Sequence, residues 1–202
     1  MKLLLALYLL SLFFYSVSML QCLKCESKSN QCIDTLTQQC GPDELCGYSA
    51  FSMNFPGQNE NNTEVKRECV ERKVCDQLGA VGKDVFATMD GGLVNGSIFM
   101  SCCESDNCNN ITTPEPDTRP NGLKCLTCRD LKGLCNSTVS CVGNQDHCLT
   151  FKVLFFQELE LPMGCVSKPL CGQSKSLFGQ FQCCSGNLCN KRQSLDQSTP
   201  QN

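Results

Sequence analysis

Cysteine is the residue type in this sequence that offers the most chemistry. The 202 residues include 20 cysteines, and a cysteine can act as a nucleophile, bind a metal ion or pair in a disulfide. A nucleophile usually needs a neighbouring base. The sequence has one histidine, His147, which we expect to be exposed at the root of a hairpin beside Cys148. We therefore predict that no residue is catalytic and that the protein is not an enzyme.

Two C-x-x-C pairs, which begin at Cys22 and Cys125, raise the alternative of a zinc site. A site of four cysteines usually brings two such pairs within about twenty residues of each other, whereas these pairs lie in separate halves of the sequence. The acidic residues do not have the spacing of a calcium loop either. We expect no metal site and no cofactor, and we expect the cysteines to pair as disulfides.

The charge of the chain excludes a further class of function. Charged residues make up 18% of the sequence and the formal net charge is −3. Such a chain offers no basic surface for nucleic acid or for an anionic membrane. The cysteine content, about one residue in ten, is typical of disulfide scaffolds in secreted proteins.

The N-terminal segment has the composition of a secretory signal peptide. Lys2 precedes an apolar run of about fifteen residues, and Ser16 and Ser18 suit cleavage after Ser18. This run is shorter than the ~20 residues that a membrane-spanning helix needs. The polar tail, residues 191–202, lacks the hydrophobic segment of a lipid-anchored precursor. The sequence predicts that residues 1–18 are removed and that the chain is secreted and extracellular, without a membrane anchor.

The cysteine spacing repeats once along the chain. The numbers of residues between neighbouring cysteines are 2, 6, 7, 5, 22, 5, 26, 0 and 4, and then 2, 6, 5, 6, 16, 5, 11, 0 and 4. The shared short intervals indicate a tandem duplication, whereas the long intervals are loops, whose length costs little free energy. We predict domains at 19–109 and 123–190, joined by a Pro-containing linker, 110–122, that ends in a turn at Pro120–Gly122.

The segments between the cysteines have the composition of short strands. Aromatic and β-branched residues fill segments 45–55, 63–70 and 97–103 in the first repeat, and segments 148–156 and 158–165 in the second. No segment shows a helical apolar period of useful length. These patterns predict an all-β protein in which hairpins project from a hub of disulfides.

The cysteine pattern resembles that of a known family. The sequences CLKC and CCESDNCN, repeated as CLTC and CCSGNLCN, resemble the three-finger domains of the urokinase-receptor and lymphocyte-antigen family. The resemblance covers nearly the whole chain after residue 18. It implies an all-β, disulfide-rich fold of two tandem three-finger domains, like snake toxins, with five disulfides each. It also implies structural roles for Asn109 and Asn190, the residues after the last cysteine of each repeat.

Spacing alone leaves the disulfide pairing open, and the family resemblance implies one pairing. In each repeat, the first cysteine would pair with the fifth, the second with the third, the fourth with the sixth, the seventh with the eighth and the ninth with the tenth. The implied pairs are Cys22–Cys46, Cys25–Cys32, Cys40–Cys69, Cys75–Cys102, Cys103–Cys108, Cys125–Cys148, Cys128–Cys135, Cys141–Cys165, Cys171–Cys183 and Cys184–Cys189.

Four N-x-[S/T] sequences predict a glycoprotein, in keeping with secretion. The acceptors are Asn61, Asn95, Asn110 and Asn136. Asn61 and Asn95 lie in the long loops of the first repeat. Glycans at these two positions would shield the loops from a partner.

Without catalytic groups, the protein is expected to act by binding an extracellular protein. Segment 150–163 carries apolar residues on both strand faces. Either both faces are packed, or Phe151, Phe155 and Phe156 form an exposed partner-binding site.

Among family members, the chain is most similar to the gamma-type phospholipase A2 inhibitors, which implies inhibition of a secreted phospholipase A2. The alternative is a signalling or adhesion ligand, urokinase-receptor-like or pheromone-like, with no inhibitory activity. Homo-oligomers and hetero-oligomers both remain open.

Overall fold

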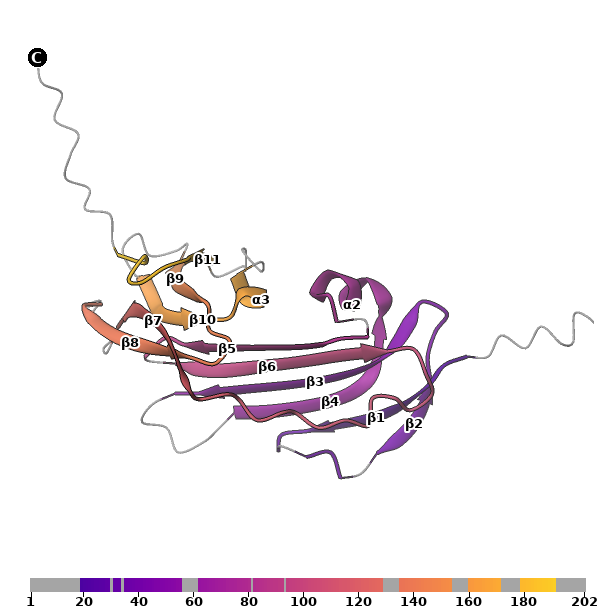
Figure 1. Cartoon of the computed structure of the whole chain (residues 1–202). Helices are drawn as coiled ribbons and strands as arrows, with labels where there is room; N and C mark the ends of the chain where they lie inside the picture. The colour runs from indigo at the N-terminus through magenta and orange to yellow at the C-terminus, as the bar shows by residue number, and fades with distance from the viewer. Residues whose placement is uncertain are drawn as a thin grey trace, which may run out of the picture.

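The computed structural model describes residues 19–29, 31–33, 35–55, 62–80, 82–92, 94–128, 135–153, 160–171 and 179–191 (Figure 1). The predicted signal peptide, Asn61, Phe155 and Phe156 lie outside these described residues. No helix in the described part of the chain is long and apolar enough to cross a bilayer.

The described chain consists mainly of β-strands, which confirms the predicted fold class. The N-terminal unit contains, in order, β1 (Gln21–Ser27), β2 (Leu36–Gln39), β3 (Glu44–Asn54), β4 (Asn62–Glu71), α2 (Arg72–Leu78), β5 (Asp84–Asp90) and β6 (Asn95–Cys103). The C-terminal unit contains β7 (Pro120–Thr127), β8 (Ser137–Val142), β9 (His147–Val153), β10 (Glu160–Val166), α3 (Lys168–Cys171) and β11 (Gly179–Cys184).

The two short helices depart from the all-β expectation. α2 has seven residues, too few to form a stable helix in isolation. Tertiary anchoring explains it, because Cys75 of α2 is bonded to Cys102 of β6. α2 ends at Gly79, which adopts the left-handed conformation with φ of +63°, a common way to end a helix. The sequence of α2 shows no helical periodicity of apolar residues, because a disulfide and not an apolar stripe holds this helix in place.

β7 starts inside the segment that the sequence assigns to the linker. The turn predicted at Pro120–Gly122 is the irregular start of this strand, where the register with β8 shifts between Pro120 and Lys124. Gly122 has a φ of +91°, which a glycine adopts without the steric cost that other residues pay.

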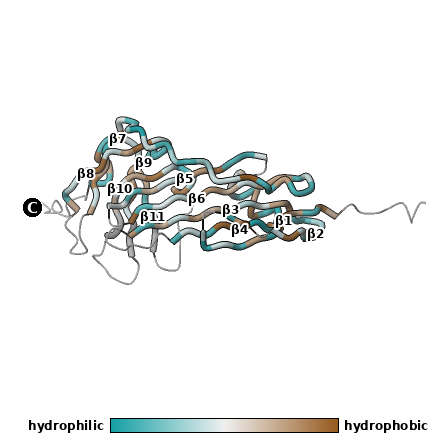
Figure 2. The backbone as a smooth tube through the Cα atoms, turned by 90° about the horizontal axis from the view of Figure 1, so that it is seen from below, coloured by the Kyte–Doolittle hydropathy of each residue, from teal (hydrophilic) through white to brown (hydrophobic). Residues whose placement is uncertain are grey.

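Strands from both units join in one sheet. Its order is β11-β9-β10-β5-β6-β3-β4-β1-β2, and β7 and β8 form a separate two-stranded sheet. Figure 2 shows β1 and β2 at one end of the molecule and β7 and β8 at the other. The described strand pairs are all antiparallel, so successive side chains point to opposite faces of the sheet.

One face of the N-terminal part of this sheet is covered by the segment between the two units. Tyr48 and Phe99 are buried on this face and contact each other edge to face, with ring centroids 5.7 Å apart. Ile111 packs against this cluster, and the Tyr48 hydroxyl lies 2.8 Å from the Thr113 hydroxyl. The guanidinium of Arg67 donates a hydrogen bond to the Ile111 carbonyl oxygen at 2.8 Å. The first part of the linker, at Ile111 and Thr113, therefore packs against the core of the N-terminal unit.

The opposite face of the sheet carries the two helices (Figure 1). Near the hub, Leu45 and Cys102 form a buried cluster with Cys75 of α2. Toward the other end, α3 contacts β5, and Ala87 of β5 is buried.

A seam between β5 and β10 joins the two units. The Ser167 N–H donates to the Thr88 carbonyl oxygen at 2.9 Å, and the Thr88 N–H donates to Ser167 Oγ at 2.9 Å. The Asn144 amide donates to the Phe86 carbonyl oxygen at 2.7 Å and accepts from Ser167 Oγ at 2.8 Å. Gly164 lets β10 approach closely, since a Cβ there would collide with the Asp90 carbonyl oxygen.

Asn109 and Asn190 each clamp the hub of their unit. The Asn190 side chain accepts from Leu126 N–H at 3.0 Å and donates to the carbonyl oxygens of Leu126 and Leu149, both at 3.0 Å. Asn109 makes the corresponding three bonds to Leu23 N–H, Leu23 C=O and Gly47 C=O. Both side chains are buried, so each one satisfies main-chain groups that water reaches poorly.

Replacement of Asn190 by alanine should destabilise the protein. Asn190→Ala leaves one N–H and two carbonyl oxygens without their partner, at a cost of about 1–3 kcal/mol. Asn187→Ala is the matched control, because Asn187 accepts one exposed hydrogen bond from Lys124 N–H. Non-reducing thermal unfolding should show a clear loss of melting temperature for Asn190→Ala and a small loss for Asn187→Ala. Equal melting temperatures for the two variants would contradict the clamp.

Replacement of Gly164 by alanine should open the seam. The added methyl group meets a main-chain carbonyl that cannot rotate away, and such overpacking costs about 1–3 kcal/mol. Gly41→Ala is a suitable control, since the nearest atom to its Cβ would be a Glu44 side-chain oxygen at 3.3 Å. Hydrogen exchange of the Ser167 amide should accelerate in Gly164→Ala only. An unchanged exchange rate and melting temperature would show that the seam does not depend on this close approach.

Candidate functional site

All 20 cysteines of the sequence lie among the described residues, and each of them is in a disulfide. The pairs are the ten that the family resemblance implies. They are Cys22–Cys46, Cys25–Cys32, Cys40–Cys69, Cys75–Cys102, Cys103–Cys108, Cys125–Cys148, Cys128–Cys135, Cys141–Cys165, Cys171–Cys183 and Cys184–Cys189.

Disulfide formation also removes the thiolates that a metal site would need. The sulfur atoms of Cys22, Cys40 and Cys46 lie within 4.8 Å of one another, and a second such group occurs in the C-terminal unit. Each sulfur of the two groups is bonded to another sulfur, whereas zinc is bound by deprotonated thiolates. The two clusters are therefore disulfides packed together in the hubs of the two units.

His147 is half-buried beside a carboxylate, where the sequence predicts an exposed residue. Its Nδ1 lies 2.9 Å from Asp146 Oδ1, and the same oxygen accepts a hydrogen bond from Lys168 N–H at 2.9 Å. Burial raises the pKa of Asp146, but the hydrogen bonds from His147 and Lys168 outweigh it, so this pKa lies below its usual value. Asp146 therefore links the ring of His147 to the first residue of α3.

The strand that the sequence favours for binding is described only in part. Phe151 lies in β9, where its Cα pairs with that of Phe181 in β11, and Phe155 and Phe156 lie outside the described residues. Of the predicted glycosylation acceptors, Asn95, Asn110 and Asn136 are all exposed. Asn95 is the first residue of β6, at the end of the sheet away from the N-terminal hub.

An apolar pair is exposed on the helix-bearing face of the sheet, between α2 and α3. Phe51 of β3 lies directly opposite Ile98 of β6, and the two residues are 38% and 36% exposed. Met53 lies two residues from Phe51 in β3, and Met100 lies two residues from Ile98 in β6, so both partly buried methionines share this face. We call the surface formed by Phe51, Met53, Ile98 and Met100 the open face.

Acidic side chains border the open face on the β4 side. Glu64 lies opposite Phe51, and the next residue on the same face of β4, Lys66, lies opposite Ser49. Lys66 Nζ contacts Glu64 Oε1 at 2.6 Å and Glu26 Oε1 at 3.6 Å. The hydrogen bond that Lys66 donates to Glu64, together with the negative charge of Glu26, raises the pKa of Lys66. Lys66 therefore stays protonated, and its single positive charge faces two carboxylates, so this rim of three residues carries a net negative charge.

The open face was not predicted from the sequence, although the sequence contains part of the pattern that would indicate it. Segment 45–55 carries apolar residues at both parities, with Tyr48 and Ala50 on one face and Phe51 and Met53 on the other. Such a strand could be buried on both sides. Only the structure shows that the linker covers the Tyr48 face and that the Phe51 face stays accessible.

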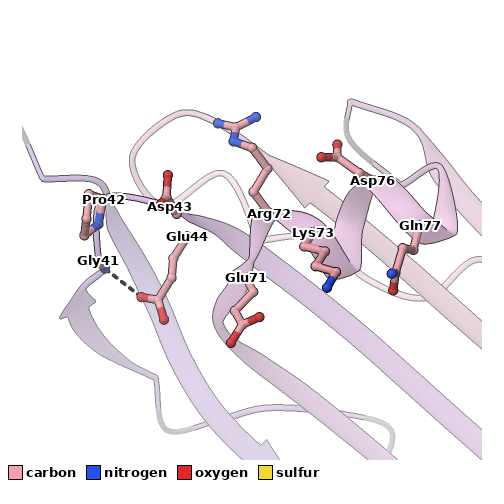
Figure 3. Close-up of a pocket in the computed structure, with 9 residues that line it drawn as sticks. All are labelled: Gly41, Pro42, Asp43, Glu44, Glu71, Arg72, Lys73, Asp76 and Gln77. Carbon is pink, nitrogen blue, oxygen red and sulfur yellow. Dashed lines mark hydrogen bonds between the residues drawn. The ribbon is translucent and has the colours of Figure 1, made fainter.

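A polar groove lies at the base of the N-terminal unit, beside α2 (Figure 3). It has a volume of about 710 Å³ and is lined by Gly41, Pro42, Asp43, Glu44, Glu71, Arg72, Lys73, Asp76 and Gln77. The Glu44 carboxylate accepts a hydrogen bond from Gly41 N–H at 2.6 Å, and Arg72 is bound to Glu104 at 2.5 Å. Two of the charged side chains that line the groove, Glu44 and Arg72, are therefore already held by contacts within the protein.

The two units correspond to two matches of one domain family. The sequence matches the u-PAR/Ly-6 domain over residues 18–111 and again over residues 121–192. Among solved structures, the crystal structure of mouse TEX101 matches 83% of this chain and 99% of its own, with 12% identity and a TM-score of 0.34. The sequence matches no curated protein. Since the two domain matches span most of the sequence, the chain belongs to the u-PAR/Ly-6 family.

Proposed function

We propose that this protein is secreted and acts without catalysis, by binding a protein partner on the open face. Domains of the u-PAR/Ly-6 family are typically extracellular modules for binding or signalling. The observation that carries the proposal is the exposure of Phe51 and Ile98 side by side on a sheet. Clustered apolar side chains at a protein surface mark interaction sites.

The open face is suited to binding because its backbone is already ordered. Phe51 lies in β3, which is paired with β4 along one side and with β6 along the other. The disulfides Cys22–Cys46 and Cys40–Cys69 hold the hub ends of β3 and β4. A partner would not have to order this part of the chain, which lowers the entropic cost of association.

The partner class that we favour is a secreted phospholipase A2, which the protein would inhibit by covering part of the enzyme surface. The sequence resemblance to gamma-type inhibitors motivates this choice. The acidic rim formed by Glu26 and Glu64 would steer a partner whose surface is basic. Inhibition should be reversible and should need no metal ion, because the disulfide-bonded sulfurs offer no thiolate ligands.

A signalling or adhesion role is the alternative, since fold alone does not fix function. A signalling ligand would use the same open face to bind an extracellular receptor. The two roles differ in the identity of the partner and in whether an enzymatic activity is lost upon binding.

A panel of purified secreted phospholipases A2 would test the proposal. We expect one of them to bind the protein and to lose activity at micromolar concentration. Phe51→Ala and Ile98→Ala should each weaken this binding by at least about 2 kcal/mol, or roughly thirtyfold. Phe99→Ala is the comparison for stability, because Phe99 is buried and its loss should cost about 3–5 kcal/mol of folding free energy.

Two controls locate the binding site. Ile33→Ala, at an exposed position on another part of the N-terminal unit, should bind like the unaltered protein. The double variant Phe155→Ala/Phe156→Ala tests the second predicted surface. Loss of binding in that variant alone would overturn the assignment to the open face. Absence of binding to every phospholipase would overturn the inhibitor proposal and favour the signalling ligand.

A further inference from the structure

The edge of the large sheet at β2 presents main-chain groups that no described strand uses. β2 is the last strand in the sheet order, and among the described residues it pairs only with β1. Strand edges of this kind are templates for pairing with another chain. The chemistry of the edge therefore depends on which main-chain groups point outward.

The register of β1 and β2 identifies these groups. The Cys40 N–H donates to the Leu20 carbonyl oxygen at 2.8 Å, and this residue pair continues the register in which Gln21 lies opposite Gln39. In antiparallel pairing, residues that bond the neighbouring strand alternate with residues whose N–H and C=O point away from it. Leu36 and Gln38 therefore bond β1, whereas Thr37 and Gln39 direct their N–H and C=O groups to the free edge.

This edge lacks most of the features that usually prevent strand addition. β2 has the sequence LTQQ, without the lysine, proline or inward-pointing charge that commonly protects sheet edges. Its shortness, four residues, is the one protective feature present. An incoming strand would meet two residues with outward main-chain groups and no charge repulsion from β2 itself.

The two most exposed large apolar residues of the described chain are the first residue of β2 and a residue shortly before that strand. Ile33 is 83% exposed and Leu36 is 72% exposed. The Cys25–Cys32 disulfide holds the residue before Ile33, and the Cys40–Cys69 disulfide holds the residue after β2. Both the apolar side chains and the edge are thus presented by a segment that is fixed at each end.

We propose that the β2 edge binds an extended segment of a protein partner, which adds to the large sheet as a further strand. Thr37 and Gln39 would each exchange main-chain hydrogen bonds with the added segment. Ile33 and Leu36 would contact its apolar side chains, which recur at alternate positions in an extended strand. The ligand is therefore an extended, uncharged peptide segment with alternating apolar residues. This site is separate from the open face and does not depend on the function proposed for it.

Substitution at Thr37 separates main-chain binding from side-chain effects. Thr37→Pro removes one outward N–H and places a ring on the free edge, but it keeps the hydrogen bonds between β2 and β1. Thr37→Val is the matched control, because it keeps the N–H and the branched shape. Leu36→Lys is a second variant that adds a protective charge and leaves the main chain unchanged.

The probe is a library of displayed random peptides of about twelve residues, which is long enough to contain one added strand. Selection for binding to the mature protein should enrich peptides with apolar residues at alternate positions. These peptides should bind Thr37→Pro and Leu36→Lys at least about tenfold more weakly than the unaltered protein. They should bind Thr37→Val equally well. Peptide binding should slow hydrogen exchange at the Thr37 and Gln39 amides, which should exchange faster than Gln38 in the free protein.

Several outcomes would overturn the proposal. One is the absence of any enriched peptide, and another is equal affinity for Thr37→Pro and Thr37→Val. If Thr37→Pro fails to fold, full affinity in Leu36→Lys together with unprotected Thr37 and Gln39 amides overturns it equally. Amide protection that rises with protein concentration in the absence of peptide would identify a second copy of this chain as the occupant.

Discussion

Disulfide bonds join the strands where they converge, and both candidate binding surfaces depend on this constraint. The buried half-cystines Cys22, Cys40 and Cys46 form the centre of the N-terminal hub, and Cys125, Cys141, Cys148 and Cys165 form the centre of the other. Small domains bury too little apolar surface to be stable without such crosslinks. Because the hub supplies this stability, the sheet beyond it can leave apolar residues such as Phe51 exposed.

The link between the two units is of a different kind, since it relies on main-chain hydrogen bonds and small polar residues. Thr88, Ser167 and Asn144 bond to one another and to main-chain groups across the seam. Gly164 permits the close approach of β10 to β5. This pairing joins β5 and β10 in one sheet and, with the linker packed on Tyr48, limits the freedom of the units relative to each other.

Cysteine spacing and strand composition were enough to predict the fold class and the positions of several strands. The strands at 45–55 and 63–70 correspond to β3 and β4, and the fold class follows from the repeated cysteine pattern. Contacts that leave no periodic signal were not predictable. α2 is held by Cys75, and the seam is made by residues that are common in loops, so neither produces a pattern. The open face was missed because β3 is apolar at both parities, and only the path of the linker decides which parity is covered.

The open face and the β2 edge differ in what they can recognise. Phe51 and Ile98 offer side-chain surface, which selects a partner by shape and apolar area. Thr37 and Gln39 offer main-chain groups, which any extended segment can match, so selectivity at the edge would come from Ile33 and Leu36. In the sheet order, β3 and β2 are separated by β4 and β1. A partner large enough to span these strands could engage both surfaces, and the second contact would then form at a high effective concentration.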